Sequence, residues 1–206
     1  MKSILTNILT FVSAIFFIGC GGSGVDSQNY QDPVFDSYTI KTIAVLPIRN
    51  SNLNIGEAKE INRYFMTGLD RKNKKYKIIG PDESIQKLNN DDLVEKYYNS
   101  LVSYSTTGIS NTETMKEIGI SLSCDAIVQG EIYDVIKRDG EFGSHRGETR
   151  CKIRYSLIST KDGKTLWETT AESHEKTSTT LSDAPALMGV LLNGMDKILE
   201  SIPNQK

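Results

Sequence analysis

The hydrophobic pattern changes to a period of two in the last part of the chain, and this change limits the possible folds more than any other feature. Apolar and polar residues alternate through residues 126–136 and again through 151–159. Side chains of a strand point to opposite faces in turn, so both segments predict strands with one solvated or lightly covered face. Lys161-Asp162-Gly163-Lys164 predicts a tight hairpin turn into a third strand, from Thr165 to about His174. We therefore predict a C-terminal antiparallel three-strand meander.

The earlier part of the chain mixes strand and helix patterns. Residues 40–48 have a continuous apolar centre and predict a central strand covered on both faces. Apolar residues at three- and four-residue spacing predict an amphipathic helix over 55–69 that lies on the sheet. The other predicted elements are a strand over 76–79, helices over 91–104 behind an Asn-Asn-Asp-Asp cap and from Ser110 onward, and a helix after Pro185. The expected fold class is α/β, an α+β sandwich with helices packed on a mixed sheet.

The first 20 residues have the layout of an export signal. A basic Lys2 precedes the apolar run 4–18, which is shorter than the roughly 20 residues of a membrane-spanning helix. Phe17-Ile18-Gly19-Cys20 resembles the lipobox of bacterial lipoproteins, with Phe17 where Leu is usual. The resemblance implies that residues 1–19 are a lipoprotein signal peptide and that Cys20 is lipidated, as the residue that carries the acyl chains. The alternative is an ordinary secretory signal with an incidental cysteine.

Residues 21–37 are rich in Gly, Ser, Asp, Asn and Gln and contain few apolar side chains. This composition predicts that residues 20–37 form a lipidated cysteine followed by a flexible linker, with a reach of about 20–25 Å. Residues 38–206 are then expected to form a single domain with its own core. The chain has 24 basic and 26 acidic residues, a balance that gives no support for a nucleic-acid partner.

The two cysteines of the domain are not expected to form a disulfide. If 126–136 and 151–159 pair about a loop near Gly143, Cys151 lies opposite about Val135. Cys124 is then about 35 Å away along the strand at ~3.3 Å per residue, whereas a disulfide needs α-carbons within about 7 Å. We predict that Cys151 is a small core residue.

Motifs that would indicate catalysis or a cofactor do not appear at the required spacing. His145 and His174 have no partner at metal-ligand spacing, so no metal is expected. Gly163-Lys164-Thr165 lacks the earlier glycine of a phosphate-binding loop, and no Gly-x-Ser-x-Gly nucleophile motif is present. The chain is therefore not expected to be an enzyme or to bind a cofactor; an enzyme would need a pocket that joins a histidine to carboxylates.

Two groups of side chains are candidates for contact with partners. Tyr97, Tyr98 and Tyr104 could form an interaction surface, or they could simply seat a helix on the core. The basic run 71–77 could contact anionic headgroups or polysaccharide, or it could be a solvated turn between a helix and a strand.

Three phrases of the sequence resemble a broad family of bacterial envelope lipoproteins that includes CsgG-type, PelC-type and LpoB-type proteins. They are residues 43–47, residues 117–119 followed by 125–132, and residues 155–168. In the last phrase, the turn Thr160-Lys161-Asp162-Gly163 leads to Leu166-Trp167-Glu168. The resemblance implies an anticodon-binding-domain-like α/β fold in which Trp167 packs against the helices. It also implies a non-catalytic role in partner binding or oligomeric assembly.

The expected function is that of a membrane-anchored lipoprotein in an envelope secretion or biogenesis system. Its expected partners are the lipid bilayer, through acylated Cys20, and either an envelope protein or further copies of itself. Gly21 stands where an Asp would retain some lipoproteins at the inner membrane, which favours the outer membrane, facing the periplasm. The alternatives are a surface-exposed lipoprotein that binds host or matrix ligands, and an LpoB-like activator of a peptidoglycan synthase, for which the linker is short.

Overall fold

The computed structural model describes residues 22–50, 52–72 and 75–203. Among them, six strands form one sheet in the order β1-β6-β5-β4-β2-β3. Neighbours in β6-β5-β4 are antiparallel, whereas β2 is parallel to β3 and to β4. This mixed sheet with its C-terminal meander confirms the predicted fold class. The strands are β1 (Ser23–Gln31), β2 (Thr42–Val45), β3 (Lys77–Ile79), β4 (Ala126–Arg138), β5 (Glu148–Ser159) and β6 (Thr165–Lys176).

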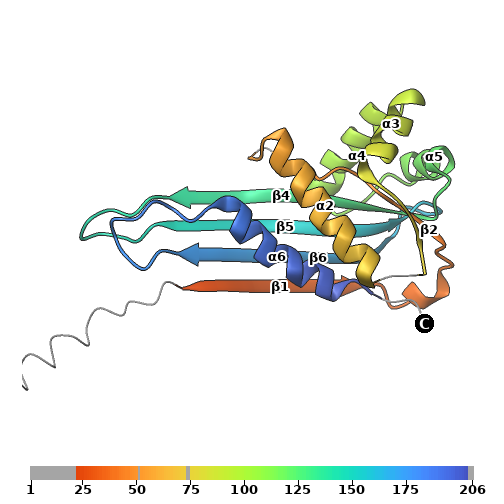
Figure 1. Cartoon of the computed structure of the whole chain (residues 1–206). Helices are drawn as coiled ribbons and strands as arrows, with labels where there is room; N and C mark the ends of the chain where they lie inside the picture. The colour runs from red at the N-terminus through yellow and green to blue at the C-terminus, as the bar shows by residue number, and fades with distance from the viewer. Residues whose placement is uncertain (1–21, 51, 73–74, 204–206) are drawn as a thin grey trace, which may run out of the picture.

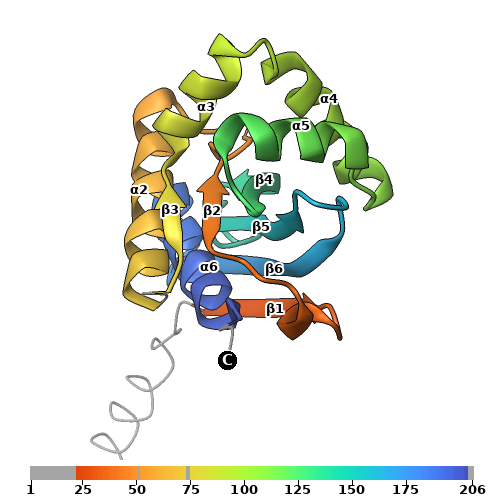
Figure 2. The same ribbon diagram turned by 90° about the vertical axis from the view of Figure 1, so that its right-hand side faces the viewer.

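Helices cover the two faces of the sheet unequally (Figures 1 and 2). On one face, α2 (Ile55–Lys72) and α6 (Leu187–Ser201) lie across the meander. The helices α3 (Pro81–Asn90), α4 (Val94–Thr107) and α5 (Thr112–Leu122) gather on the other face, at the end of the sheet that holds β2. A single turn of 3-10 helix, η2 (Phe35–Ser37), follows β1.

Each face of the sheet has its own hydrophobic core. In the first core, α2 and α6 pack on inward side chains of the meander, and Trp167 is buried there as predicted. In the second core, Met115, Ile118 and Leu122 of α5 pack on β2 and β4. The strand segments between the two cores are buried on both faces, as their continuous apolar sequence indicates.

The meander extends beyond the second core, so half of one face has no helix over it (Figure 1). The first seven residues of β4 are buried, and exposure begins at Tyr133. Along β5, buried and partly exposed residues alternate from Glu148 to Tyr155. The alternation predicted from the sequence therefore occurs in the part of β4 and β5 that no helix covers on one face.

The hairpin between β4 and β5 has the expected register. Ala126 lies opposite Ser159, and the pairing shifts by a bulge between Tyr133 and Ile136. Cys151 sits opposite that bulge in the core, and Cys124 precedes the other end of the strand. Both cysteines are buried free thiols.

The expected flexible linker over residues 21–37 is wrong from Ser23 onward. Ser23–Gln31 forms β1, which pairs antiparallel with β6 along its whole length, and Phe35 is buried in the first core. Composition misled the prediction because an edge strand is held by backbone hydrogen bonds and can keep polar side chains in water. Residues 23–37 therefore belong to the folded domain, which was expected to start at Tyr38.

The run Asn89-Asn90-Asp91-Asp92 closes α3 and turns the chain, instead of capping the next helix. Asp92 has a φ of 55°, a left-handed conformation that interrupts helical hydrogen bonding. α4 begins at Val94 with Leu93 in the cap position. Tyr98 and Val102 of this helix are exposed.

Candidate functional site

The uncovered face of the meander carries a row of basic side chains between acidic ones. Arg150, Lys152 and Arg154 occupy alternate positions of β5. Lys152 Nζ lies 3.1 Å from a carboxylate oxygen of Asp134 on β4 and 3.4 Å from one of Glu172 on β6. Exposed ion pairs of this kind stabilise a fold by about 0–1 kcal/mol each. These ion pairs therefore add little stability, and together they make this face of the sheet polar, with both positive and negative charges.

Where this face meets α4, the ion pairs become buried. The side chain of Glu131 is 6% exposed and lies 2.5 Å from an Arg49 nitrogen and 2.7 Å from an Arg154 nitrogen. Ser105 of α4 donates a third hydrogen bond to this carboxylate, at 2.9 Å. One carboxylate thus binds two guanidinium groups.

Aromatic rings fix the position of Arg154. Its guanidinium carbon lies 5.5 Å from the ring centre of Tyr104 and 5.7 Å from that of Tyr133, within the range of cation–π attraction. The Tyr104 hydroxyl donates to Glu168 at 2.5 Å. Burial, together with this hydrogen bond, raises the pKa of Tyr104 to about 12, so the phenol is neutral at physiological pH.

A cavity of about 300 Å³ opens beside this cluster. Arg49 and Tyr133 form part of its wall together with Asn50 and Asn52 of the loop after β2, and Tyr98 of α4 closes one side. Tyr98 is 55% exposed. Amides, a guanidinium and an exposed aromatic ring are groups that bind another molecule by hydrogen bonding and stacking, so the chemistry of this cavity is that of recognition.

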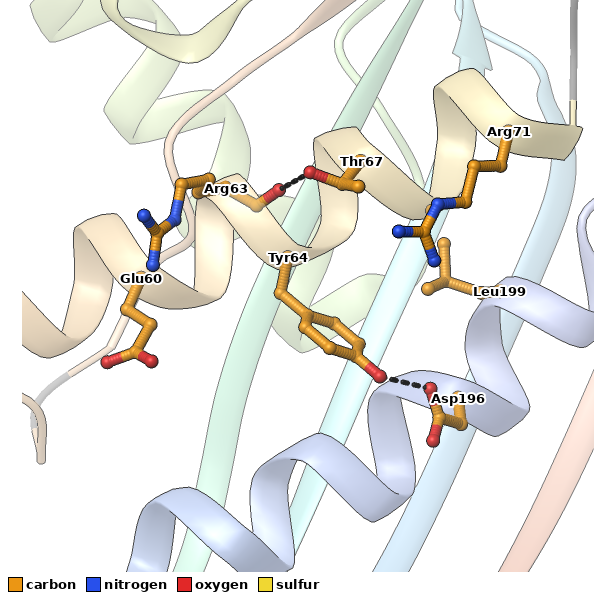
Figure 3. Close-up of a pocket in the computed structure, with 8 residues that line it drawn as sticks. Glu60, Arg63, Tyr64, Thr67, Arg71, Asp196 and Leu199 are labelled. Carbon is orange, nitrogen blue, oxygen red and sulfur yellow. Dashed lines mark hydrogen bonds between the residues drawn. The ribbon is translucent and has the colours of Figure 1, made fainter.

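A second cavity, of about 430 Å³, lies between α2 and α6 on the opposite face (Figure 3). Tyr64 reaches from α2 to α6, where its hydroxyl donates to Asp196 Oδ1 at 2.6 Å. Arg63 and Arg71 lie on either side of Tyr64 along α2. The two helices approach closely below, since a Cβ on Gly68 would lie 2.2 Å from the Leu199 side chain. Tyr64 and Asp196 therefore link the two helices.

The sequence-predicted site residues fall in separate places. Cys20 lies outside the described residues. His145 is in the loop between β4 and β5, with Nδ1 3.7 Å from a Glu141 carboxylate oxygen. His174 is half-buried on β6, where its ring packs over Gly24 of β1. Within the described residues, no group of three or more His, Cys, Asp and Glu side chains could hold a metal ion.

The tyrosines of α4 divide between the two roles considered for them. Tyr97 and Tyr104 are buried and seat the helix, whereas Tyr98 faces solvent at the cavity. The buried ion cluster was missed, although its signal was present: Glu131 occupies an inward strand position between apolar neighbours, where an acid needs a charged partner. Its partner Arg49 could not be found from local spacing because it is far away in the sequence.

Among the residues that the structure describes, no helix is both long and apolar enough to cross a membrane.

Comparison with known proteins identifies the fold. No protein-family model and no curated protein sequence matches the chain. Among solved structures, the PelC dodecamer from Paraburkholderia phytofirmans is 13% identical with a TM-score of 0.51, over 88% of this chain and 100% of that chain. The hypothetical protein CT253 from Chlamydia trachomatis is 9% identical with a TM-score of 0.50, over 79% and 95%. The lipoprotein GNA1162 from Neisseria meningitidis is 14% identical with a TM-score of 0.44, over 79% and 99%.

At these identities, the likeness to PelC and CT253 shows a shared fold, and the likeness to GNA1162 is too weak to support an argument. The predicted resemblance to PelC-type proteins is thus confirmed for the fold of the domain.

Proposed function

We propose that the protein is a non-catalytic lipoprotein that serves as an assembly component of an envelope secretion or biogenesis system. It is anchored through acylated Cys20, in the outer membrane and facing the periplasm, and its main protein partner is a second copy of the same chain. The contact surface in this proposal is the outer side of α4 together with the cavity beside it.

The observation that carries the proposal is the exposed apolar side of α4 at the edge of the uncovered sheet. Tyr98 and Val102 are one helical turn apart, and both are exposed. The cavity with Arg49 lies next to Tyr98. Tyrosine and arginine are enriched at the centres of protein interfaces, and a charged rim around an apolar centre is the usual arrangement of such surfaces.

The fold comparison supports assembly as the form of binding. The solved PelC structure is a dodecamer, and its entire chain is matched by this one. A chain with the same fold and an exposed aromatic patch has the means to form a similar closed assembly, in which one patch meets a different surface of the next copy.

The alternatives receive less support from the fold. An LpoB-like activator is implied to reach its synthase on a long linker, whereas β1 begins at Ser23, three residues after Cys20. A surface-exposed lipoprotein that binds host or matrix ligands would use the same cavity. Protease treatment of intact cells distinguishes that location, because only a surface-exposed domain is then digested.

Photo-crosslinking in cells tests the proposed contact. A photoreactive phenylalanine analogue replaces Tyr98 in the full-length protein, and a control replaces Ile120 on α5, which at 81% is more exposed than Tyr98 at 55%. We expect adducts at multiples of the chain's own mass for position 98 and none for position 120. Adducts only with another protein, or equal adducts at both positions, would contradict self-assembly through α4.

A further inference from the structure

We propose that the two loops at the distal end of the meander, residues 139–147 and 177–186, dock on the bilayer in which the protein is anchored. This inference rests on the proposed lipidation of Cys20. The occupant of the surface is the lipid itself, and the loops, called here the distal loops, hold the domain against it in one orientation.

The two distal loops are joined to each other by hydrogen bonds. The Gly140 N–H donates to the Ser182 carbonyl at 3.0 Å, and the Ala184 N–H donates to Asp139 Oδ1 at 2.9 Å. The backbones meet closely, since a Cβ on Gly140 would lie 2.6 Å from the Thr180 carbonyl oxygen. Because each loop holds the other in place, the backbone positions of their outermost residues are fixed relative to each other.

Each distal loop presents one large apolar side chain to solvent. Phe142 is 80% exposed and Leu181 is 73% exposed. Apolar side chains at the tips of loops bind membranes by entering the boundary between headgroups and acyl chains. Neither residue packs on the core, so neither is explained by the stability of the fold.

The charges around the distal loops are mixed, which favours apolar insertion over electrostatic attraction. The loops themselves contain the acidic residues Asp139, Glu141 and Asp183 and the basic residue Arg146, and the basic residues Arg138 and Lys176 end the flanking strands β4 and β6. A surface that is attracted to anionic headgroups would instead carry an excess of Lys and Arg. The expected docking therefore depends on Phe142 and Leu181.

The chain enters the domain at this same end (Figure 1). Ser23 at the start of β1 pairs with Glu175, and the Gly22 carbonyl accepts from the Lys176 N–H at 2.9 Å, directly before the second distal loop. Cys20 is two residues before Gly22, so its α-carbon is within about 7 Å at no more than ~3.6 Å per residue. An acylated Cys20 thus brings the distal loops to the membrane.

The other end of the sheet is far from the anchor. β5 has 12 residues and runs from the distal loops to the region of α5, a span on the order of 35–40 Å at ~3.3 Å per residue. With the loops on the bilayer, the α3–α5 layer and the cavity beside α4 stand away from the lipid and stay open to other proteins. The short connection, and not a flexible linker, would set this distance.

Depth-dependent fluorescence quenching tests the docking. Full-length acylated protein is reconstituted into phosphatidylcholine vesicles with and without brominated acyl chains, as the variants Phe142→Trp, Leu181→Trp and, as control, Ile120→Trp on α5. We expect quenched, blue-shifted emission from the tryptophan at 142 or 181, and unchanged emission from the control. The native Trp167 is buried in the core and contributes a constant background.

The intact mass of each preparation separates the two ways in which the inference can fail. If the extracted protein carries no acyl mass on Cys20, the anchor is refuted and the docking with it. If the protein is acylated and bound to vesicles, but the emission at 142 and 181 is no more quenched than at 120, the docking alone is refuted.

Discussion

Replacing Glu131 by Ala should destabilise the fold more than any other single change in the charged face. The substitution removes the carboxylate that pairs with both Arg49 and Arg154 and accepts the Ser105 hydroxyl. Arg154 is then left without its nearest counter-ion while its side chain is only 18% exposed. The interaction with the Tyr104 and Tyr133 rings holds this guanidinium in place, so it cannot turn fully into water.

The expected loss follows from the exposure of the groups involved. Removing one partner of a buried ion pair destabilises a protein by about 3–5 kcal/mol. Arg49 is 33% exposed and can turn toward water, so the loss for Glu131→Ala should lie near the lower value, about 3 kcal/mol. Arg49→Ala leaves Glu131 paired with Arg154 and should lower stability by only about 1 kcal/mol. For a domain of this size, 3 kcal/mol corresponds to a fall in Tm of roughly 6–12 °C.

Urea unfolding can measure both variants, because the chain has a single tryptophan, Trp167, buried in the core as an internal probe. The free energies of unfolding of Glu131→Ala and Arg49→Ala are compared with that of the unsubstituted protein. A loss below about 1 kcal/mol for Glu131→Ala, or an equal loss for Arg49→Ala, would refute the view that Glu131 is the centre of the cluster.

Three further outcomes are expected. Gly130→Ala should lower the free energy of unfolding by about 1–3 kcal/mol, because the new Cβ would lie 2.6 Å from the Tyr155 ring. Gly189→Ala should raise the free energy of unfolding slightly in the same urea assay, because no atom lies within 4 Å of the new Cβ. Burial and a carboxylate hydrogen bond raise the pKa of Tyr104 to about 12. The contribution of Tyr104 to the free energy of unfolding should therefore be fully present below about pH 10 and decrease as the pH rises toward 12. Tyr104→Phe should make this decrease smaller, and an unchanged slope of stability against pH would contradict the prediction. Burial raises the pKa of Cys151 to about 12, so this thiol should resist a thiol reagent in the folded protein and react in urea; rapid reaction of the folded protein would contradict its burial.

The meander could be predicted because its information is local. The period of two places Ile153 and Tyr155 on the core face, and the Asp-Gly turn at Asp162 specifies the hairpin register. The positive φ of Gly163, 71°, shows why glycine is required in that turn. These features depend on residues that are close in the sequence, and for this reason they could be predicted correctly.

Features that depend on distant partners could not be predicted in the same way. β1 is a strand because it pairs with β6, and its own polar residues give no amphipathic signal. The exposure of Tyr98 depends on where α4 crosses the sheet, which its helical spacing does not determine. The pairing of Glu131 with Arg49 depends on the parallel contact between the segment after β2 and β4.

The mass of the detergent-extracted, full-length protein in light scattering tests the proposed assembly most directly. The account predicts a defined multiple of the 22.9 kDa chain, corrected for signal removal and acyl groups, that falls to the monomer in the double variant Tyr98→Ser, Val102→Ser. Ile120→Ser should leave the mass unchanged. A monomer for the unsubstituted protein at all concentrations would contradict self-assembly through α4.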